Sequence, residues 1–574
     1  MKQISGYPSI DKPWLKYYNE EAINASLPEC SMYEYMWENN KNHLNDIALI
    51  YFNKKITYRK LFEMIDRTAK AFLSLGIKEK DTVTLLVLSQ PETIYIVYAL
   101  NKIGVNINLV NVLSSEKDIQ NSIEETNSNC IVSLNIFSSR LEKILDNPKI
   151  TCLIELNLAN SLNQIYKCVI NKKIQAKKFN HKKKILYKDF ITKLQEKIVK
   201  KTNYSPYIIT HTGGTTGTPK GVILSNKAIN GVVVEYKNNL KWQRQETYMD
   251  LVVPFVIYGL CVNIHMPLSL GMKTVLIPKA DTSQIADFFY KYKPNHVTSI
   301  PSYWQPLLNS KKVEKFDFSF LITAGAGGDG MTKDLENQLN RFFEEHNSKT
   351  VLLNGYGMTE LCSTVSTCQY NARKQGSVGI PLPHNNISTF DVETMEEKRF
   401  DEQGEICVLS PFVMEEYLNN ENETKKILKK HSDGKIWLHT GDLGHIDSDG
   451  FIFIDGRIKR IILTQLDDLG HKVFPAQIEN ILSQNPNVES ACVVAQEHKE
   501  RNFVPIAFII LKDKSTKEIK NDLFNLCKKE LPEYAQPSDF IFRDSFPLTS
   551  VGKIDYKALE KEAETIFNEG NKNA

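Results

Sequence analysis

The chain has 574 residues, of which 42% are hydrophobic and 10% aromatic, so it holds enough apolar material for a real core and is not a disordered protein. The length predicts about two to four domains. Lys and Arg number 71 against 68 Asp and Glu, and this near balance excludes a protein built mainly to coat nucleic acid.

Helices and strands alternate in the first third of the chain. Apolar side chains recur at helical spacing through residues 57–76, and the pattern ends at Gly76. Residues 82–88 form a short β-rich apolar run, residues 91–103 predict a second helix, and residues 105–111 predict another strand. Such alternation is typical of a parallel sheet with helices on both faces.

Residues 251–272 carry no Asp, Glu, Lys or Arg, and such an absence of charge is also a feature of membrane spans. They include Pro254 and Pro267, however, and lipid offers no partners for the backbone groups that proline frees. We therefore expect a buried strand and helix here, and no membrane span.

Residues 167–201 hold thirteen Lys and only two acidic residues. This Lys-rich segment has two interpretations, a solvated surface insertion or a docking patch for an acidic partner. A nucleic-acid partner is not expected, because aromatic residues for base stacking are not interleaved with the lysines.

The composition changes again from about residue 390, where strands alternate with Gly- and Asp-rich turns, and a smaller region follows Arg460 with a helix near residues 516–530. We predict an α/β fold, with a large N-terminal domain of parallel sheets (residues 1–458) and a small α+β C-terminal domain (residues 459–574). The ten cysteines include no CxxC motif, which is typical of reduced thiols, and the N-terminus has no apolar core of signal-peptide length. We expect a cytoplasmic protein.

The strongest local signal is the segment YIITHTGGTTGTPKGVIL at residues 207–224. Glycines let the backbone approach an anion, threonine hydroxyls add donors, and a lysine supplies a compact positive charge. These are the requirements of a loop that holds a polyphosphate, although the spacing is not that of a Walker A loop. The candidate phosphate ligands are Thr212, Gly213, Gly214, Thr215, Thr216, Gly217 and Lys220.

This loop resembles the phosphate loop of the acyl-adenylate-forming superfamily, which comprises acyl-coenzyme A synthetases, adenylation domains of nonribosomal peptide synthetases, and luciferases. Residues 354–360, 438–443, 455–460 and 547–554 resemble four further motifs of the same family, in the same order. The match spans about residues 50–560. It implies a large AMP-binding domain followed by a small, mobile C-terminal domain.

The resemblance assigns the nucleotide-binding residues, and each assignment also makes chemical sense. Tyr356 lies between glycines, so one face of its ring is open to a flat base, and Asn354 can both donate to and accept from an adenine edge. Glu360 is a hard oxygen ligand for Mg²⁺, and Thr359 can reach a phosphate oxygen. Asp442 can accept both ribose hydroxyls. The family pattern adds Ala326, Gly355, Gly357 and Arg457 to the ATP and AMP site.

The resemblance also implies the reaction. A carboxylic acid attacks the α-phosphate of ATP, releasing pyrophosphate, and the acyl-AMP then passes to a thiol. Lys553 bridges the carboxylate and the α-phosphate, with Thr359 and Glu360 as further catalytic residues, because negative charge builds on the transferring group. The small domain then rotates about Arg460 and withdraws Lys553.

The acyl pocket corresponds to Phe255, Val256, Tyr258, Gly259 and Gly325. Because residues 251–272 lack an acid, a buried substrate ammonium would have no counter-charge, which favours a fatty or aryl acid over an α-amino acid. The acceptor stays open between coenzyme A and the phosphopantetheine of an acidic carrier protein, since the stretch from Gly456 to Gly470 is about four residues longer than in the family. An alternative of another class is a nucleotide-binding regulator without turnover.

Overall fold

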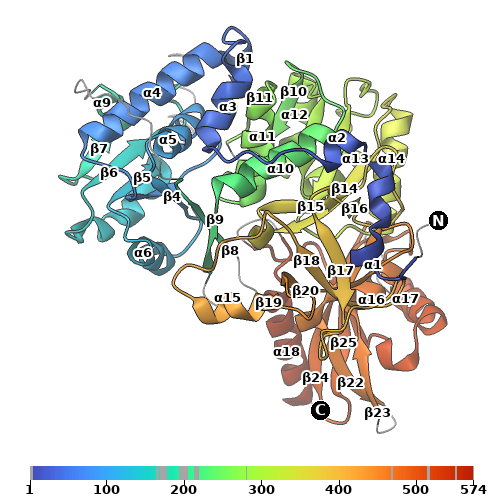
Figure 1. The fold of residues 1–574 in the computed structure, drawn as a ribbon. Helices are drawn as coiled ribbons and strands as arrows, with labels where there is room; N and C mark the ends of the chain where they lie inside the picture. The colour runs from blue at the N-terminus through green and yellow to red at the C-terminus, as the bar shows by residue number, and fades with distance from the viewer. Residues whose placement is uncertain are drawn as a thin grey trace.

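The computed structural model describes residues 4–162, 167, 176–177, 179–192, 205–212, 219–278, 281–466, 469–512, 517–549 and 553–572. Within these residues the chain forms four sheets, three of which belong to a large N-terminal part and one to a smaller C-terminal part (Figure 1). The predicted α/β fold with a large N-terminal and a small C-terminal domain is confirmed.

The first lobe is built on a seven-stranded sheet with the strand order β7-β6-β5-β3-β4-β8-β9. All neighbours are parallel except β8 and β9, which form an antiparallel pair at one edge. The parallel sheet predicted from the alternating pattern is therefore present. Its strands are β3 (Thr82–Leu86), β4 (Asn106–Leu109), β5 (Cys130–Leu134), β6 (Cys152–Leu156), β7 (Lys184–Leu186), β8 (Ile208–Thr212) and β9 (Lys220–Leu224).

The second lobe is built on a nine-stranded sheet with the order β16-β15-β14-β13-β12-β10-β11-β1-β2. Its central strands are parallel, and antiparallel pairs close both edges. The strands are β1 (Ile47–Tyr51), β2 (Lys54–Thr57), β10 (Thr247–Asp250), β11 (Lys273–Leu276), β12 (His296–Ser299), β13 (Thr323–Gly327), β14 (Leu352–Met358), β15 (Ser363–Thr367) and β16 (Ile380–Pro381).

Helices cover both lobes, and the predicted helices at 57–76 and 91–103 are confirmed as α4 and α5. The side chain of Thr57 caps α4 by accepting from the Lys60 N–H, which explains where that helix begins. The helices of the N-terminal part are α1 (Pro8–Asp11), α2 (Glu20–Ile23), α3 (Met32–Asn40), α4 (Tyr58–Ser74), α5 (Pro91–Lys102), α6 (Glu116–Glu125), α7 (Asn135–Ser138), α9 (Tyr187–Phe190), α10 (Asn226–Asn239), α11 (Met266–Ser269), α12 (Ile285–Tyr292), α13 (Pro301–Leu308), α14 (Lys333–Glu345) and α15 (Glu421–Ile427).

The third sheet is antiparallel and consists of β17 (Asn386–Phe390), β18 (Gly404–Leu409), β19 (Leu428–Lys430), β20 (Ile436–Ile446) and β21 (Ile452–Arg457). A 3₁₀ turn, Ile458–Arg460, connects β21 to the C-terminal sheet. That sheet contains β22 (Ile462–Leu466), β23 (Leu469–Val473), β24 (Val488–His498), β25 (Asn502–Leu511) and β26 (Asp539–Arg543), with α16 (Pro475–Leu482), α17 (Lys517–Glu530) and α18 (Tyr556–Lys572). We keep 1–458 and 459–574 as the proposed domain limits.

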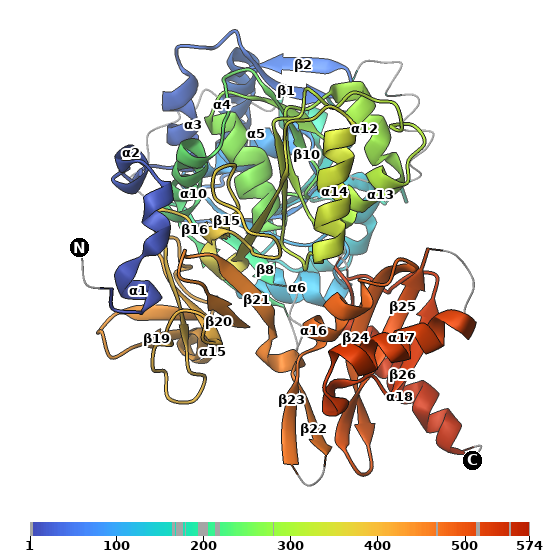
Figure 2. The same cartoon turned by 90° about the vertical axis from the view of Figure 1, so that its right-hand side faces the viewer.

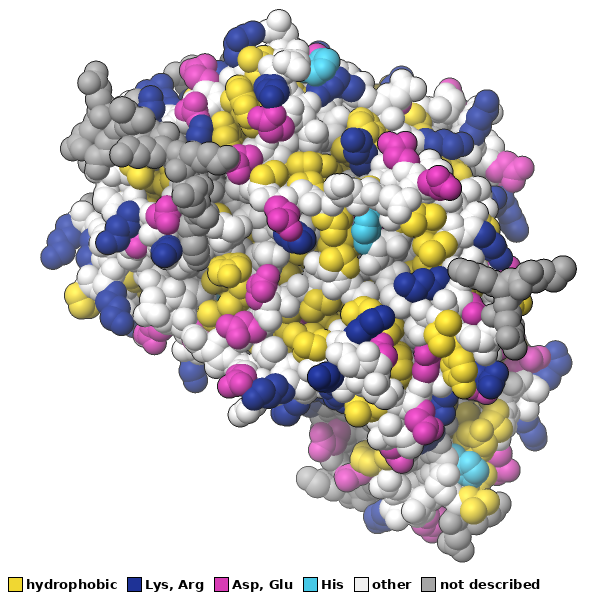
Figure 3. Space-filling model, viewed as in Figure 1, with side chains coloured by type: hydrophobic (Ala, Val, Ile, Leu, Met, Phe, Trp, Pro, Cys, Tyr) yellow, Lys and Arg dark blue, Asp and Glu magenta, His cyan; other side chains and the backbone are white. Residues whose placement is uncertain are grey.

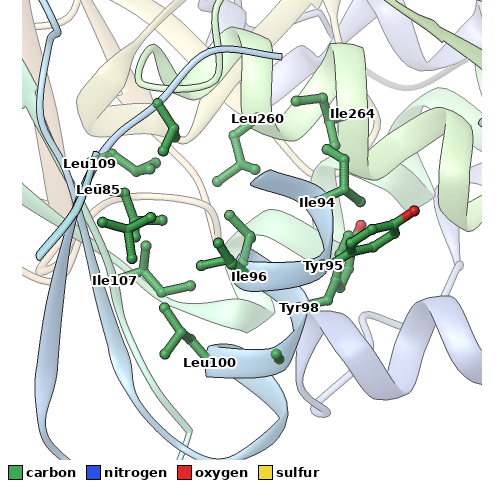
Figure 4. Close-up of a cluster of buried hydrophobic side chains, with 14 of the residues drawn as sticks. Leu85, Ile94, Tyr95, Ile96, Tyr98, Leu100, Ile107, Leu109, Leu260 and Ile264 are labelled. Atoms are coloured by element: carbon green, nitrogen blue, oxygen red, sulfur yellow. The ribbon is translucent and has the colours of Figure 1, made fainter. Parts of the chain in front are cut away.

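The largest core lies around α5, which is buried along nearly its whole length. Figure 4 shows its side chains meeting Leu85, Ile107 and Leu109 of the first sheet on one side and Leu260 and Ile264 on the other. A helix that is apolar on all faces needs such a position, enclosed by other elements. This helix therefore joins the two lobes through one continuous core.

Two expectations need correction. Residues 251–272 are buried as predicted, but they contain a π-helix, Gly259–His265, followed by α11, and the predicted strand is absent from this stretch. The Lys-rich segment is not simply a solvated insertion, because residues 184–186 form the edge strand β7 and Phe190 packs its ring 4.9 Å from that of Phe72. Most other residues between 163 and 204 lie outside the described residues.

No helix among the described residues has the length and apolar character to cross a membrane. On the face shown in Figure 3, Lys and Arg side chains are interspersed with Asp and Glu side chains, as the near-balanced composition predicts. The described cysteines are all free thiols.

Trp304 should be important for stability because its indole supports β13. Its ring is 1% exposed, and its Nε1 donates to the Gly325 carbonyl oxygen at 2.9 Å. Trp304→Phe removes this hydrogen bond and part of a fully buried ring, and should lower the free energy of unfolding by about 1–3 kcal/mol, measured by urea denaturation. Trp242 is half-buried and donates to a backbone oxygen in a solvent-exposed hydrogen bond, so Trp242→Phe is the control and should cost less, under about 1 kcal/mol.

His265 should make stability fall with acid. Its imidazole is fully buried between the Tyr98 hydroxyl and the Asn230 amide oxygen, and burial lowers its pKa to about 3. Between pH 6.5 and 3 the unfolded chain takes up a proton that the folded chain refuses, so stability falls as pH falls, by up to about 1.4 kcal/mol per pH unit. Denaturation at several pH values should give a shallower slope for His265→Gln. An equal slope in His265→Gln and in the exposed control His43→Gln would contradict this assignment.

Candidate functional site

A cavity lies where the carboxyl ends of several parallel strands meet. Residues of β8, β13 and β14 line it, together with the stretch 251–258 after β10. Open α/β sheets place their ligand sites at this edge. The predicted site residues that line the cavity are Val256, Tyr258, Gly325, Ala326, Gly355, Tyr356, Gly357, Thr359 and Lys553.

Beside the cavity, the carboxylate of Asp442 joins three strands. The Tyr356 hydroxyl donates to Asp442 Oδ2 at 2.6 Å, and Arg457 Nε lies 2.8 Å from Asp442 Oδ1. The register of β20 and β21 pairs Asp442 directly with Arg457, which explains the contact. Burial raises the pKa of Asp442, although Arg457 and Tyr356 act in the opposite direction. Each carboxylate oxygen keeps a further lone pair for a ligand hydroxyl.

The strands β13 and β14 supply the wall of small residues predicted for the nucleotide. Their parallel register places Ala326 beside Asn354 and Gly327 beside Gly355. Only glycine fits at position 357, because a Cβ atom there would lie 1.6 Å from the Ser363 carbonyl oxygen. Asn354 is buried behind this wall, where its Nδ2 donates to the Ser377 carbonyl oxygen at 3.3 Å.

A second cluster of polar and charged side chains includes Glu360. This carboxylate is 6% exposed, and its Oε1 accepts from the Tyr417 hydroxyl at 2.6 Å. Lys220 lies 4.5 Å above the Tyr417 ring and forms an ion pair with Glu423 at 2.6 Å. Lys220 and Lys426 lower the pKa of Glu423 to about 2. The lysine of the phosphate loop is thus neutralised by a carboxylate that the sequence did not single out.

The phosphate loop connects β8 to β9, whose register pairs Thr212 with Lys220. Thr212 and Lys220 are described, and neither is among the cavity residues. Gly213, Gly214, Thr215, Thr216 and Gly217 lie outside the described residues.

Lys553 reaches the cavity from the C-terminal part of the chain. Its carbonyl oxygen accepts from the Thr549 N–H at 2.7 Å. Desolvation lowers the pKa of Lys553, as does Arg457, while Asp329, Asp442 and Glu360 act in the opposite direction. The lysine therefore lies in the electrostatic field of the same groups that surround the nucleotide-binding candidates.

Only some of the residues predicted for the acyl pocket line the cavity. Val256, Tyr258 and Gly325 line the cavity, whereas Phe255 and Gly259 are not among its lining residues. Phe255 is buried in the core, and its carbonyl oxygen accepts from the Thr210 hydroxyl at 2.9 Å. A Cβ atom on Gly259 would lie 2.2 Å from the Val253 carbonyl oxygen. These two residues support the wall of the pocket rather than form it.

None of the described residues that line the cavity is Asp or Glu. The acid that directly precedes the stretch 251–258 is Asp250. It is fully buried at the end of β10, and burial raises its pKa well above the ordinary value. Burial thus favours the uncharged form of this carboxyl group, which offers no counter-charge to a substrate ammonium. The side chains facing the cavity from residues 251–258 are aliphatic or aromatic.

Arg460 is held by the C-terminal part of the chain. Its Nη2 donates to Glu479 Oε1 at 2.8 Å and to the Val493 carbonyl oxygen at 3.1 Å, and its guanidinium lies 3.6 Å above the Tyr556 ring. Arg460 is the last residue of the turn that connects the third sheet to the C-terminal sheet, a position that suits the predicted hinge. The hinge motion itself stays a prediction.

The extra residues before Gly470 lengthen a hairpin. The register of β22 and β23 pairs Leu466 with Leu469, so residues 467–468, which lie outside the described residues, connect the two strands. Leu463 and Leu469 are exposed on this hairpin, which projects away from the body of the molecule in Figure 2.

Sequence reasoning missed His211, Tyr417, Glu423 and Asp329. His211 lines the cavity, and its Nε2 lies 2.8 Å from Asn108 Oδ1. Burial lowers its pKa to about 4, so this imidazole is neutral at pH 7. Only His211 carried a sequence signal, since it directly precedes the Thr-Gly loop. The others are recognisable only by their contacts.

Comparisons with curated proteins cover nearly the whole chain. A long-chain-fatty-acid–CoA ligase of Bacillus subtilis (strain 168) is 26% identical over 568 residues, covering 96% of this chain and 98% of that protein. A probable 4-coumarate–CoA ligase 1 of Dictyostelium discoideum is 26% identical over 562 residues, with 95% and 97% covered.

Solved structures share the fold. The anthranilate CoA ligase AuaEII in complex with anthranoyl-AMP matches with a TM-score of 0.80 at 20% identity, over 94% of this chain and 98% of that one. ATP-bound MatB from Rhodopseudomonas palustris matches with a TM-score of 0.80 at 20% identity, over 93% and 99%. The family model described as AMP-binding enzyme matches residues 36–418, and the model of the AMP-binding enzyme C-terminal domain matches residues 477–553. The chain therefore belongs to the AMP-binding enzyme family.

Proposed function

We propose that this protein is an AMP-forming acid–thiol ligase. It would activate a carboxylic acid with ATP as acyl-AMP, release pyrophosphate, and transfer the acyl group to a thiol. The proposal rests on one observation above all, that Lys553 of the C-terminal part lines the same cavity as Tyr356 and Thr359. The names of the curated relatives, which are CoA ligases, support it.

In this proposal each set of residues at the site binds one part of the ATP molecule or supports the reaction. Tyr356 and the wall at Ala326, Gly355 and Gly357 accept the adenine, and Asp442 with Arg457 holds the ribose. The loop from Thr212 to Lys220 holds the outer phosphates. Lys553 stabilises the negative charge that develops as the substrate carboxylate attacks the α-phosphate.

The residues around Glu360 fit Mg²⁺. The donor is the buried carboxylate of Glu360, and hard oxygen ligands are those that Mg²⁺ prefers. The Tyr417 hydroxyl fixes one carboxylate oxygen, so the other remains for the ion. The ion would neutralise phosphate charge, Glu360 would hold it, and Thr359 would contact a phosphate oxygen.

Coenzyme A is the favoured acceptor, because the relatives reported above are CoA ligases. A carrier protein stays an alternative that would use the Lys-rich segment, and a cytoplasmic location stays a prediction. A regulator without turnover is disfavoured, since a protein that only binds nucleotide has no need of Lys553 at the cavity.

The first functional prediction concerns the substrate. Because no described residue lining the cavity is acidic, an α-ammonium group would be buried without a counter-charge. Fatty or aryl acids should therefore support pyrophosphate exchange into ATP better than any of the common α-amino acids. The measurement is the exchange rate over a broad panel of acids at equal concentration. An α-amino acid as the best substrate would show the argument to be wrong.

The second functional prediction separates the two half-reactions. Lys553→Ala should slow acyl-AMP formation by about 10²–10³-fold, as the loss of one well-placed electrostatic contact does. Thioester formation from synthetic acyl-AMP should stay near the parent rate, because the lysine acts only while phosphorus is attacked.

Lys557→Ala is the matched control, since Lys557 is an exposed lysine at the start of α18, only four residues away. It should leave both half-reactions unchanged. Equal slowing of both half-reactions by Lys553→Ala would mean that the lysine only anchors the C-terminal part, and the two-step model would lose its support.

A further inference from the structure

A group of metal-ligating side chains lies in the third sheet, outside the cavity. Cys407, His431 and His439 are all buried, and one ligand atom from each lies within 4.8 Å of the other two. Cys407 and His439 are direct cross-strand partners on β18 and β20, so their side chains share one face of the sheet. These strands and β19 lie side by side in Figure 1.

His431 is brought to this face by a tight turn between β19 and β20. Its N–H donates to the Lys435 carbonyl oxygen at 3.0 Å, and its own carbonyl accepts from the Gly434 N–H at 3.0 Å. Phe390 packs edge-on against the imidazole at a centroid distance of 4.5 Å. The position of the ring is thus determined by backbone and packing, independently of any ligand.

The hydrogen bonding of the two imidazoles is incomplete. The Nε2 atoms of His431 and His439 lie 2.9 Å apart, and His439 Nδ1 lies 2.7 Å from Glu405 Oε2. With the His439 Nδ1–H donating to this carboxylate, its Nε2 can only accept, so the proton between the rings belongs to His431. His431 Nδ1 has no partner among the described residues, although the side chain is only 7% exposed. Moving the His431 proton from Nε2 to this nitrogen frees the Nε2 lone pairs of both rings for a metal ion.

We propose that Cys407, His431 and His439 bind a zinc-type divalent ion. One thiolate and two imidazoles are the ligands that Zn²⁺ selects, in contrast to the hard oxygens around Glu360. Glu405 completes the arrangement, because a ligating histidine commonly donates its second ring N–H to a carboxylate. The thiolate and this carboxylate together balance the two positive charges of the ion.

Glu405 would link the metal site to the strand that carries the proposed ribose ligand. Glu405 Oε1 accepts from the Gly441 N–H at 3.0 Å, and Gly441 directly precedes Asp442. Binding would therefore fix β18, the turn at His431, and the part of β20 that carries the proposed ribose ligand. The role is structural, and its direct consequence is added stability of the folded chain.

The test uses the full chain after chelator treatment, titrated with Co²⁺ and with Zn²⁺ alone. The wild type should bind one Co²⁺ with thiolate-to-cobalt charge-transfer absorption and tetrahedral d–d bands, and Zn²⁺ should displace it. Zn²⁺ should also raise the midpoint of thermal unfolding. Binding should release one proton from the thiol, so affinity should fall as the pH is lowered.

Three variants and a control assign the ligands. Cys407→Ser should abolish the charge-transfer band, and His431→Gln should remove the stoichiometric site. Glu405→Gln should keep the band but weaken the affinity about 10–100-fold, as expected for a residue that only positions a ligand. Cys492→Ser, at another fully buried cysteine, should leave binding unchanged.

A wild type that shows neither the cobalt band nor stabilisation by Zn²⁺ would overturn the proposal, and this holds even if a variant fails to fold. A band that persists in folded Cys407→Ser would also overturn it, because the metal would then be bound elsewhere. Circular dichroism of each variant checks folding.

Discussion

The arrangement of the site depends on one buried carboxylate. Asp442 accepts a hydrogen bond from Tyr356 and an ion pair from Arg457, so strands β14, β20 and β21 meet at a single side chain. Two of these strands belong to the third sheet and one to the nine-stranded sheet, and β21 ends just before the turn into the C-terminal part. A carboxylate that is only 3% exposed needs both partners, because desolvation alone would favour its protonated form. The Asp442 carboxylate therefore links the strands of the site to the strand that leads into the C-terminal part.

The cavity combines an acid-free wall with one charged side chain. The stretch 251–258 and the residues from Gly325 to Gly328 are free of acids, whereas Lys553 lines the cavity and interacts electrostatically with Asp329, Asp442 and Arg457. In the proposed function the acid-free wall would suit an acyl group and the charged residues a triphosphate, because these two ligands differ in polarity. Lys220 is paired with Glu423, and in the proposed function a phosphate would compete with this carboxylate for the ammonium.

The third sheet supports this site from behind. Glu405 accepts from Gly441 with one oxygen and from His439 with the other, so the strand that carries Asp442 is bonded to a buried network on the opposite side of the backbone. A network of this kind specifies a geometry when all its members are satisfied. Among the described residues of this network, His431 Nδ1 has no hydrogen-bond partner, and the proposed metal ion would take the place of the proton between the Nε2 atoms of His431 and His439.

The sequence by itself determined what depends on local pattern and residue chemistry. Helical and strand periods predicted α4, α5, β3 and β4, and ordered motifs predicted Tyr356, Thr359 and Lys553, all of which line one cavity. Only the tertiary structure decided which distant side chains became partners. The pairs Glu360–Tyr417, Lys220–Glu423 and Cys407–His439 form through strand register and loop packing, which no local spacing encodes. The π-helix at Gly259–His265 and the edge strand β7 were missed for the same reason, since burial between two lobes and pairing at a sheet edge override local composition.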